Sequence, residues 1–337
     1  MNPSHQKEVV VITGASAGVG RATVREFAKR GACLGLLARG KDGLEAAREE
    51  AEKLGGKAIV CLTDVASFEQ VNQAAEKIER ELGPITLWIN NAMTSVFSPV
   101  KEMEAEEYRR VTEVTYLGVV HGTLAALHRM LSRNHGVIIQ VGSALAYRGI
   151  PLQSAYCASK HAIQGFVDSL RSELIHDKSR VRVTMVHMPA LNTPQFGWVK
   201  SRLPRKAQPV PPIFQPEVAA RAIVWAAHHK RREILVGLPT IKAVFGNKIF
   251  PGWLDHYLAK NGYDSQQFDG SEDPSRPHNL YRPVPGDHGA HGVFDDRAQS
   301  FSPTSWINLH RKKIFLSVLG LGTVLGLSYL KKLKQTK

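Results

Sequence analysis

The chain has 337 residues, 43% of them hydrophobic, and its 44 Lys and Arg against 30 Asp and Glu give a formal net charge of +14. This length suffices for one full core and an appendage, and the lack of a nucleic-acid-binding motif argues against DNA binding as the reason for the charge. The three cysteines have no metal-ligand spacing, which predicts free thiols in a reducing compartment and no metal site.

The first element is a short β-branched run, Glu8–Ile12, which predicts a buried strand and lacks the features of a signal peptide. The turn TGASAGVG follows at 13–20, and an amphipathic helix is predicted over Arg21–Arg30. A strand, a glycine-rich turn and a helix N-terminus form a cradle for a pyrophosphate, because glycine lets the backbone approach and free N–H groups favour the anion. A glycine-rich turn without a ligand is the alternative.

The second predicted strand is Cys33–Ala38, and Arg39 follows it directly. In a dinucleotide-binding fold an acidic residue at this point would bind the ribose 2′-hydroxyl, whereas an arginine suits a 2′-phosphate. The sequence therefore favours NADP (NADPH) over NAD. The alternative is that Arg39 is a solvated loop charge, since arginines are mostly exposed.

The remaining elements continue the alternation of strand and helix. A long helix is predicted over Met103–Leu131, and further strands are predicted at Lys57–Leu62, Thr86–Ile89, Val137–Val141, Arg180–His187 and Glu233–Val236. Such alternation indicates an α/β fold with a doubly wound parallel sheet of the Rossmann type.

One short segment, SALAYRGIPLQSAYCASK at 143–160, brings together a hydroxyl, a phenol and an ammonium group. Tyr156 and Lys160 are four residues apart, so on a helix they share one face. A neighbouring cation lowers the pKa of a phenol, and a tyrosine tuned in this way can act as a general acid–base. Ser143 could hydrogen-bond the same substrate oxygen. Taken alone, the pair could equally be a solvated pair on a helix surface.

Together, TGASAGVG, Asn90-Asn91-Ala92 and Ser143…Tyr156-x-x-x-Lys160 resemble the classical short-chain dehydrogenase/reductase family, over roughly residues 8–237. The resemblance implies that Tyr156 is the acid–base, Lys160 its electrostatic partner and ribose anchor, and Ser143 the positioner of the substrate oxygen. It also implies a homodimer or homotetramer. The residues that it assigns to the cofactor are Thr13, Gly14, Ser16, Gly18, Val19, Gly20, Arg39, Asp64, Val65, Asn91, Ala92, Tyr156, Lys160, Pro189 and Thr193.

Asp64 has a second interpretation from the residues themselves, because it stands in the N-cap region of a helix, ahead of Ser67. Three positions depart from the family pattern: Met93 and Ala190 replace glycines, and Thr115 replaces an asparagine that the family implies holds a water in a proton relay. A threonine hydroxyl could still bind water, with one polar group instead of two. These departures support a rival prediction, a non-catalytic NADP-binding scaffold or redox sensor.

The segment Gln195–Gln215 is rich in proline, aromatic and basic residues, and in the family such a segment caps the substrate. Phe196, Trp198, Leu203 and Phe214 would form an apolar lid over a lipophilic alcohol or carbonyl substrate. An ordinary surface loop with a few core anchors is the alternative. The predicted activity is hydride transfer that interconverts this alcohol and carbonyl.

The predicted catalytic domain covers residues 1–250, followed by an irregular or flexible linker at 251–305 and a terminal segment at 306–337. His278, His288 and His291 in the linker have no metal-ligand spacing. Ile314–Leu330 is a stretch of seventeen residues without a charge, between basic flanks, which predicts a single-pass membrane anchor with the catalytic domain on the cytoplasmic side. The alternatives are a core helix and a soluble cytoplasmic protein.

Overall fold

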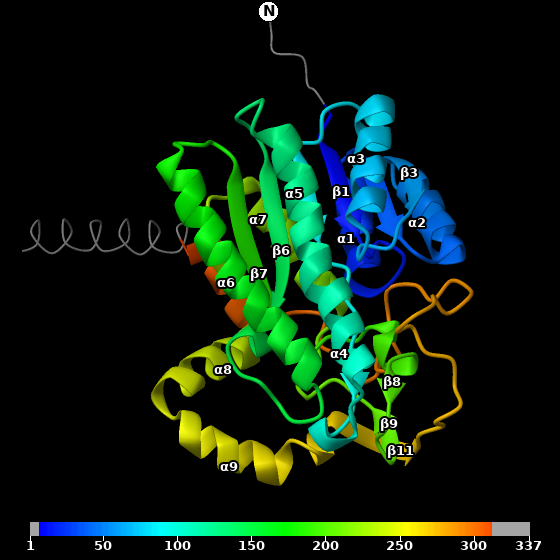
Figure 1. Ribbon diagram of the computed structural model, residues 1–337, viewed down its shortest axis with the longest axis vertical. Helices are drawn as coiled ribbons and strands as arrows, with labels where there is room; N and C mark the ends of the chain where they lie inside the picture. Colours follow the sequence, from blue (N-terminus) through cyan, green and yellow to red (C-terminus); the bar gives the residue numbers. More distant parts are fainter. Residues whose placement is uncertain (1–6, 312–337) are drawn as a thin grey trace, which may run out of the picture.

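A computed structural model describes residues 7–311. Its main sheet has seven parallel strands in the order β10-β7-β6-β4-β1-β2-β3, which confirms the predicted doubly wound fold (Figure 1). The strands are β1 (Val9–Thr13), β2 (Cys33–Ala38), β3 (Lys57–Leu62), β4 (Leu87–Asn90), β6 (Val137–Ser143), β7 (Arg182–Met188) and β10 (Glu233–Leu235).

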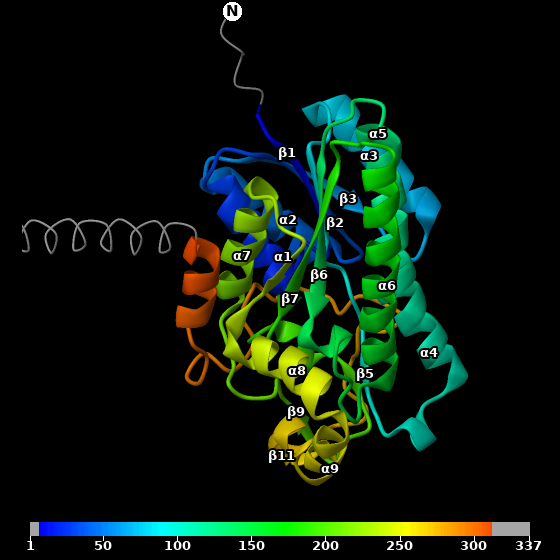
Figure 2. The same ribbon diagram turned by 90° about the vertical axis from the view of Figure 1, so that its left-hand side faces the viewer.

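Helices cover both faces of this sheet (Figure 2). One face packs on α1 (Gly18–Ala28), α2 (Lys41–Lys53) and α7 (Pro216–His228), and the other packs on α3 (Phe68–Leu82), α5 (Gly118–Met130) and α6 (Ser154–His176). Because successive strand side chains point to opposite faces, Val10 and Ile12 enter the first core and Val9 and Val11 the second.

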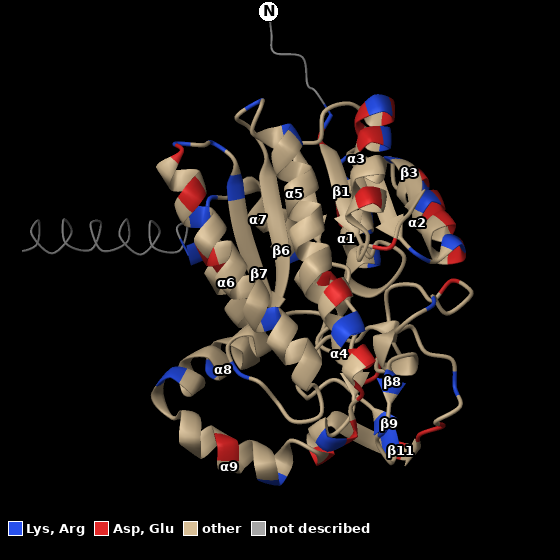
Figure 3. Ribbon diagram, in the orientation of Figure 1, with Lys and Arg blue, Asp and Glu red and all other residues tan. Residues whose placement is uncertain are grey.

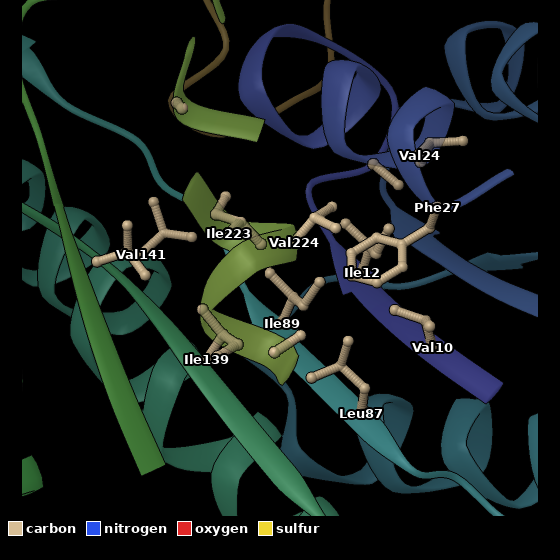
Figure 4. Close-up of a cluster of buried hydrophobic side chains, with 14 of the residues drawn as sticks. Val10, Ile12, Val24, Phe27, Leu87, Ile89, Ile139, Val141, Ile223 and Val224 are labelled. Atoms are coloured by element: carbon tan, nitrogen blue, oxygen red, sulfur yellow. The ribbon is translucent and has the colours of Figure 1, made fainter. Parts of the chain in front are cut away.

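The first of these cores fills the space between the sheet and the helices α1 and α7 (Figure 4). Phe27 of α1 and Ile223 of α7 lie over Ile12 and Ile89 of the strands, and all four side chains are fully buried. Charged side chains lie on the outer surfaces of α2 and α3, whereas β6 carries none (Figure 3). The sheet is therefore held by apolar burial on both faces.

The long helix predicted over Met103–Leu131 is interrupted. It consists of α4 (Ala105–Thr112), a π-helical turn over Glu113–Leu117 and then α5. α5 lies so close to the sheet that a Cβ on Gly118 would come within 2.6 Å of Val65, and one on Gly122 within 2.1 Å of Asn90. Single π-helical turns inside α-helices frequently mark functional sites.

The predicted linker at 251–305 is only in part irregular. It contains α9 (Pro251–Asn261), which follows α8 (Gly237–Ile249), and β11 (Gln267–Ser271), which pairs antiparallel with β9 (Arg205–Ala207). Beyond β11 the backbone is largely irregular, as expected, but it packs against the domain and buries Leu280, Ala290 and Phe294. The predicted irregular backbone is thus present in this stretch, where isolated apolar anchors pack it on the domain without any helical or strand periodicity.

Among residues 7–311 the structure contains no helix that is long and apolar enough to cross a membrane. The predicted anchor at Ile314–Leu330 lies outside the described residues, so the structure lends it no support. The two remaining short strands, β5 (Val96–Phe97) and β8 (Lys200–Ser201), pair with each other beside the site described next.

Candidate active site

A cavity of about 470 Å³ opens at the carboxyl ends of the strands, where ligands bind in doubly wound folds. Most of the predicted site residues line it, and Thr13, Gly20 and Thr115 stand behind the lining. The predicted residues in the lining are Gly14, Ser16, Gly18, Val19, Arg39, Asp64, Val65, Asn91, Ala92, Ser143, Tyr156, Lys160, Pro189 and Thr193.

The glycine-rich turn has the backbone that a pyrophosphate cradle needs. Gly14 has a φ of +68° and Gly18 a φ of +55°, conformations that favour glycine. A Cβ on Gly20 would lie 2.0 Å from the Gly14 carbonyl oxygen, so only glycine lets α1 start this close to the turn. The N-terminus of α1 then points into the cavity mouth without a side-chain cap, and these residues fit a bound dinucleotide.

Thr13 and Asn91 join the ends of β1 and β4 beneath this turn. The Thr13 hydroxyl accepts hydrogen bonds from the backbone N–H groups of Asn91 (2.9 Å) and Ala92 (3.0 Å). In return, the Asn91 side-chain amide donates to the Thr13 carbonyl at 3.0 Å and the Gly14 carbonyl at 3.2 Å. Thr13 thus shapes the floor of the site from behind.

α6 places the predicted catalytic residues Tyr156 and Lys160 one turn apart, as their spacing predicts. Lys160 is 2% exposed, and its ammonium donates to the Val141 carbonyl at 2.7 Å and lies 5.5 Å from the centre of the Tyr156 ring. The Ser143 hydroxyl lies beside the Tyr156 phenol and accepts from the Leu145 N–H at 3.1 Å. The three groups therefore meet at one wall of the cavity.

The protonation of this set differs from the expectation. Burial raises the pKa of Tyr156 above its ordinary value, and the neighbouring Ser143 hydroxyl only partly offsets that effect. Burial also lowers the pKa of Lys160 to about 8. The expected lowering of the Tyr156 pKa is not met, because the Lys160 ammonium faces a carbonyl and the phenol ring. At neutral pH the phenol is a proton donor.

Thr115 lies in the π-helical turn and binds the loop after β4. Its hydroxyl donates to the Thr94 carbonyl at 2.9 Å and accepts from the Thr94 N–H at 3.0 Å. One acceptor position of the hydroxyl remains. Its role in a proton relay stays a prediction, whereas its contact with Thr94 fixes the loop that carries Met93 into the cavity.

At the opposite end of the cavity, Asp64 accepts from Arg110 at 2.5 Å and from the Ala66 N–H at 3.0 Å. Burial alone would raise the pKa of Asp64, but the hydrogen bonds from Arg110 and the Ala66 N–H, together with the charges of Arg110 and Arg39, outweigh it and lower that pKa. The N-cap of α3 is Ser67, so Asp64 does not cap that helix itself.

Arg39 is half-buried and not a solvated loop charge. Its guanidinium donates to the main-chain carbonyls of Asn279 (2.5 Å), Tyr281 (3.0 Å) and Leu280 (3.5 Å). Burial and the nearby Arg110 lower the pKa of Arg39, against the opposing effect of Asp64. Two guanidinium groups therefore stand in this corner; Arg110 is paired with Asp64 and lies 4.0 Å from Glu113, whereas no carboxylate of the described residues pairs with Arg39.

The predicted apolar lid divides into two parts. Phe196 and Trp198 line the cavity. Leu203 instead packs in a small core with Phe97, and Phe214 belongs to the main core beside α7. Phe196 and Trp198 thus lie where a lid over the cavity would be, whereas Leu203 and Phe214 are core anchors, as the alternative expected.

A buried polar cluster behind Ser143 was missed by sequence reasoning. His187 is fully buried, with Nδ1 3.1 Å from the Ser143 carbonyl oxygen and Nε2 3.4 Å from Glu233. Tyr147 donates to the same carboxylate and accepts from Gln164 at 2.9 Å, and burial together with Glu233 raises the pKa of Tyr147 to about 12. The one available signal was a histidine at the end of an apolar strand.

The fold, the glycine-rich turn and the Ser143–Tyr156–Lys160 set define an oxidoreductase of the dinucleotide-binding class. A family model described as short chain dehydrogenase matches residues 8–202, which shows that the chain belongs to this family, as its motifs predict. Members bind NAD(P).

Several curated relatives agree. The uncharacterized oxidoreductase YxnA of Bacillus subtilis (strain 168) is 34% identical over 272 residues, which are 80% of this chain and 76% of that protein. 17-beta-hydroxysteroid dehydrogenase 13 of Homo sapiens is 39% identical over 167 residues, 50% of this chain and 56% of that protein. 3-dehydrosphinganine reductase of Danio rerio is 31% identical over 223 residues, 64% of this chain and 67% of that protein.

A solved structure extends the comparison. The alcohol dehydrogenase from the archaeon Thermococcus sibiricus, complexed with 5-hydroxy-NADP, superimposes with a TM-score of 0.59 at 27% identity, over 68% of this chain and 95% of that chain. About a third of the present chain therefore lies outside that superposition, and the match to the family model ends at residue 202.

Proposed function

We propose that the protein is an NADP(H)-dependent oxidoreductase that interconverts an alcohol and a carbonyl on a lipophilic substrate. The observation that carries the proposal is the meeting of Ser143, Tyr156 and Lys160 at one wall of a cavity whose other end is the glycine-rich turn. A scaffold or redox sensor, the second candidate, has no use for a buried phenol that is paired with a hydroxyl and lies beside a buried ammonium.

When bound, NADPH would supply the hydride, and the proton comes from the protein. In the direction of reduction, Tyr156 donates its phenolic proton to the substrate oxygen as the carbonyl becomes an alcohol. The Lys160 charge stabilises the phenolate that remains, and Ser143 holds the substrate oxygen by a hydrogen bond. The raised pKa of Tyr156 suits this direction, because the phenol starts out protonated.

The preference for NADP is supported by the charges around Arg39. Asp64 and Glu113 pair with Arg110, so the Arg39 charge in the cavity lining is the one that a 2′-phosphate would balance. The lipophilic substrate is supported by the apolar wall that Phe196, Trp198 and Leu191 form. Two relatives whose names mention a hydroxysteroid and a sphinganine agree with such a substrate.

A homodimer or homotetramer is also proposed. Leu117, Leu124 and Leu131 are each more than a third exposed and recur every seven residues along α5 and its ends. An exposed apolar stripe on a helix is typical of a face that packs on another helix.

The test is turnover of steroid, retinoid and long-chain acyl carbonyls with NADPH and with NADH. We expect turnover, and a preference for NADPH of about tenfold or more, as a charge-assisted hydrogen bond of about 1.5–3 kcal/mol would give. Arg39→Ala should reduce kcat/KM with NADPH strongly and with NADH less, because Arg39 also ties the segment at 279–281.

Arg80→Ala, which removes an exposed arginine on α3, is the matched control and should change neither value. Equal losses with both cofactors would show that Arg39 is purely structural. Binding of the dinucleotide without turnover of any carbonyl or alcohol would favour the scaffold.

A further inference from the structure

The segment Asn279–Gly292, here called the strap, crosses the open side of the cavity. In Figure 1 it belongs to the orange coil below α2. Its Asn279 N–H donates to the Trp198 carbonyl at 3.0 Å, and near its other end the Gly289 carbonyl accepts from the Gly18 N–H at 3.0 Å. The strap residues in the cavity lining are Asn279, Pro283, Val284, Gly286 and His288.

One anchor of the strap stands at the Arg39 end. Arg39 donates to three successive strap carbonyls, and Arg110 donates to the Leu280 carbonyl at 3.1 Å. The Leu280 side chain is fully buried and packs with Val96 and Val111. The side chains of Arg39 and Arg110 thus hold the strap through hydrogen bonds to its backbone carbonyls.

The second anchor stands at the N-terminus of α1. Asp287 accepts from Arg21 at 3.2 Å, and Arg21 is completely buried beneath the glycine-rich turn. The Gly286 N–H donates to Asp42 at 2.9 Å, and Ala290 is buried against α1 and α7. The Asp287 side chain is 41% exposed, so water can compete for this anchor more easily than for the buried Leu280.

Between the anchors the strap is exposed on its outer side and meets the start of α2 on its inner side. Tyr281, Arg282 and Pro283 are exposed. A Cβ built on Gly40 would lie 3.5 Å from the Cβ of Pro283. The strap therefore forms an outer wall of the cavity that runs from the Arg39 corner to the glycine-rich turn, where the Gly289 carbonyl meets the Gly18 N–H.

We infer that the strap is the outer wall and the gate of the dinucleotide site, so that NADP(H) is enclosed beneath it and exchanges only when an anchor releases. The inference rests on the proposed function in that the cavity must hold a dinucleotide. It assigns cofactor-facing residues that lie beyond the family match at 8–202. The anchor at Asp287 is the one that opens, because its contacts are polar and partly exposed.

A disulfide that locks the strap tests the gate. Gly40→Cys with Pro283→Cys places two Cβ atoms about 3.5 Å apart, at the short end of the range for disulfides. The native Cys33, Cys61 and Cys157 are buried, which favours selective oxidation of the new pair. Mass spectrometry and thiol titration confirm the bond, and stopped-flow fluorescence then measures NADPH binding and its displacement by excess NADP.

In the oxidised double variant we expect both NADPH entry and release to slow by roughly tenfold or more, because lid opening then limits exchange. Reduction should abolish the slowing, and neither single variant should change its exchange rates between reducing and oxidising conditions. Equal exchange rates for the oxidised and reduced forms would overturn the inference.

A second variant tests the gate in the opposite direction. Asp287→Ala removes the charged partner of Arg21 and should speed NADPH release by about tenfold. The rate of single-turnover reduction should stay unchanged, because Asp287 lies outside the catalytic set. Asp296→Ala, an exposed carboxylate beyond the strap, is the matched control.

Unchanged release in Asp287→Ala would overturn the assignment of the opening anchor even if the disulfide cannot be formed. A wild-type protein that binds no dinucleotide would instead refute the proposed function, so the two failures are distinguishable.

Discussion

The sheet and the strap enclose the same cavity from opposite sides, but different forces hold them. The sheet buries apolar side chains on both faces, and all residues of its central strands β1, β4 and β6 are buried. The strap buries a few apolar anchors and otherwise relies on arginine contacts with its carbonyls and with Asp287. The proposed catalytic side chains come from β6 of the sheet and from α6, which packs on it, and the outer wall comes from the strap.

This difference separates two requirements of the reaction. Proton transfer needs groups held in a fixed geometry, whereas cofactor exchange needs an element that opens. Elements with few buried apolar contacts open at lower free energy than core strands do. The proposed catalytic residues therefore lie on elements with a high free energy of local opening, and the outer wall is an element with a lower one.

The largest effect should come from Tyr156→Phe, which removes one oxygen from the sheet side of the cavity. Turnover should fall by about 10²–10⁴-fold, the usual contribution of a positioned acid–base. NADPH entry and release should stay at wild-type rates, because the strap contacts are unchanged. Steady-state turnover and stopped-flow binding measure the two quantities separately.

Tyr108→Phe is the matched control. The Tyr108 hydroxyl is hydrogen-bonded to Ser154 at 2.6 Å, and neither residue lines the cavity. This variant should leave turnover within a few-fold of wild type. Near wild-type turnover in Tyr156→Phe would contradict the proposed mechanism.

The next largest effect is a difference in unfolding between variants of two fully buried leucines, Leu36 in β2 and Leu280 in the strap. Leu36→Ala should lower the free energy of unfolding by about 2–5 kcal/mol and shift the denaturation midpoint, as cavity formation in a core does. Leu280→Ala should leave that midpoint nearly unchanged, because the strap detaches without unfolding the sheet.

Hydrogen exchange measured by mass spectrometry locates the change in each variant. In Leu280→Ala, the peptides that cover 279–292 should exchange faster while those of β1 and β2 keep wild-type protection. A midpoint shift in Leu280→Ala as large as that in Leu36→Ala would show that strap and sheet unfold as one unit.

The smallest effect concerns the buried charge of Lys160. Its pKa in the folded protein is about 8, below the ordinary 10.5. Between these pH values the unfolded chain therefore binds more protons than the folded protein does. The free energy of unfolding of the wild type rises with pH across that interval as a result. Lys160→Met lacks this group. The stability of wild type relative to the variant should therefore increase by about 2–3 kcal/mol from pH 7 to pH 10.

Urea unfolding of both proteins at several pH values measures that difference. The comparison cancels the titration of groups that the two proteins share. A difference that is constant from pH 7 to pH 10 would mean that Lys160 is solvated in the folded protein.

Much of the sheet was predictable from local sequence. β2 and β3 have the predicted bounds, because continuous apolar runs between polar turns identify buried parallel strands. The spacing of Tyr156 and Lys160 also predicted that they share one face of a helix, which α6 confirms. The interruption of the long helix was not predictable in the same way, because the π-helical turn depends on contacts with Val65 and Thr94.

The strap escaped prediction for a physical reason. Its order comes from Arg39 and Arg21, which lie 240 and 266 residues away from their partners Asn279 and Asp287. No local periodicity encodes such contacts. The pKa of Tyr156 was mispredicted for a related reason, because spacing places Lys160 nearby but does not reveal that its ammonium faces the Val141 carbonyl.

Those long separations also set an order of events during synthesis. The ribosome synthesises the N-terminal part of a domain first. Contacts between residues that are far apart in the sequence form late. The glycine-rich turn and the Ser143–Tyr156–Lys160 set are therefore exposed to the cell before residues 279–292 exist. We expect the nascent sheet to present a binding surface without its outer wall, so that a dinucleotide bound at that stage is enclosed when the strap docks.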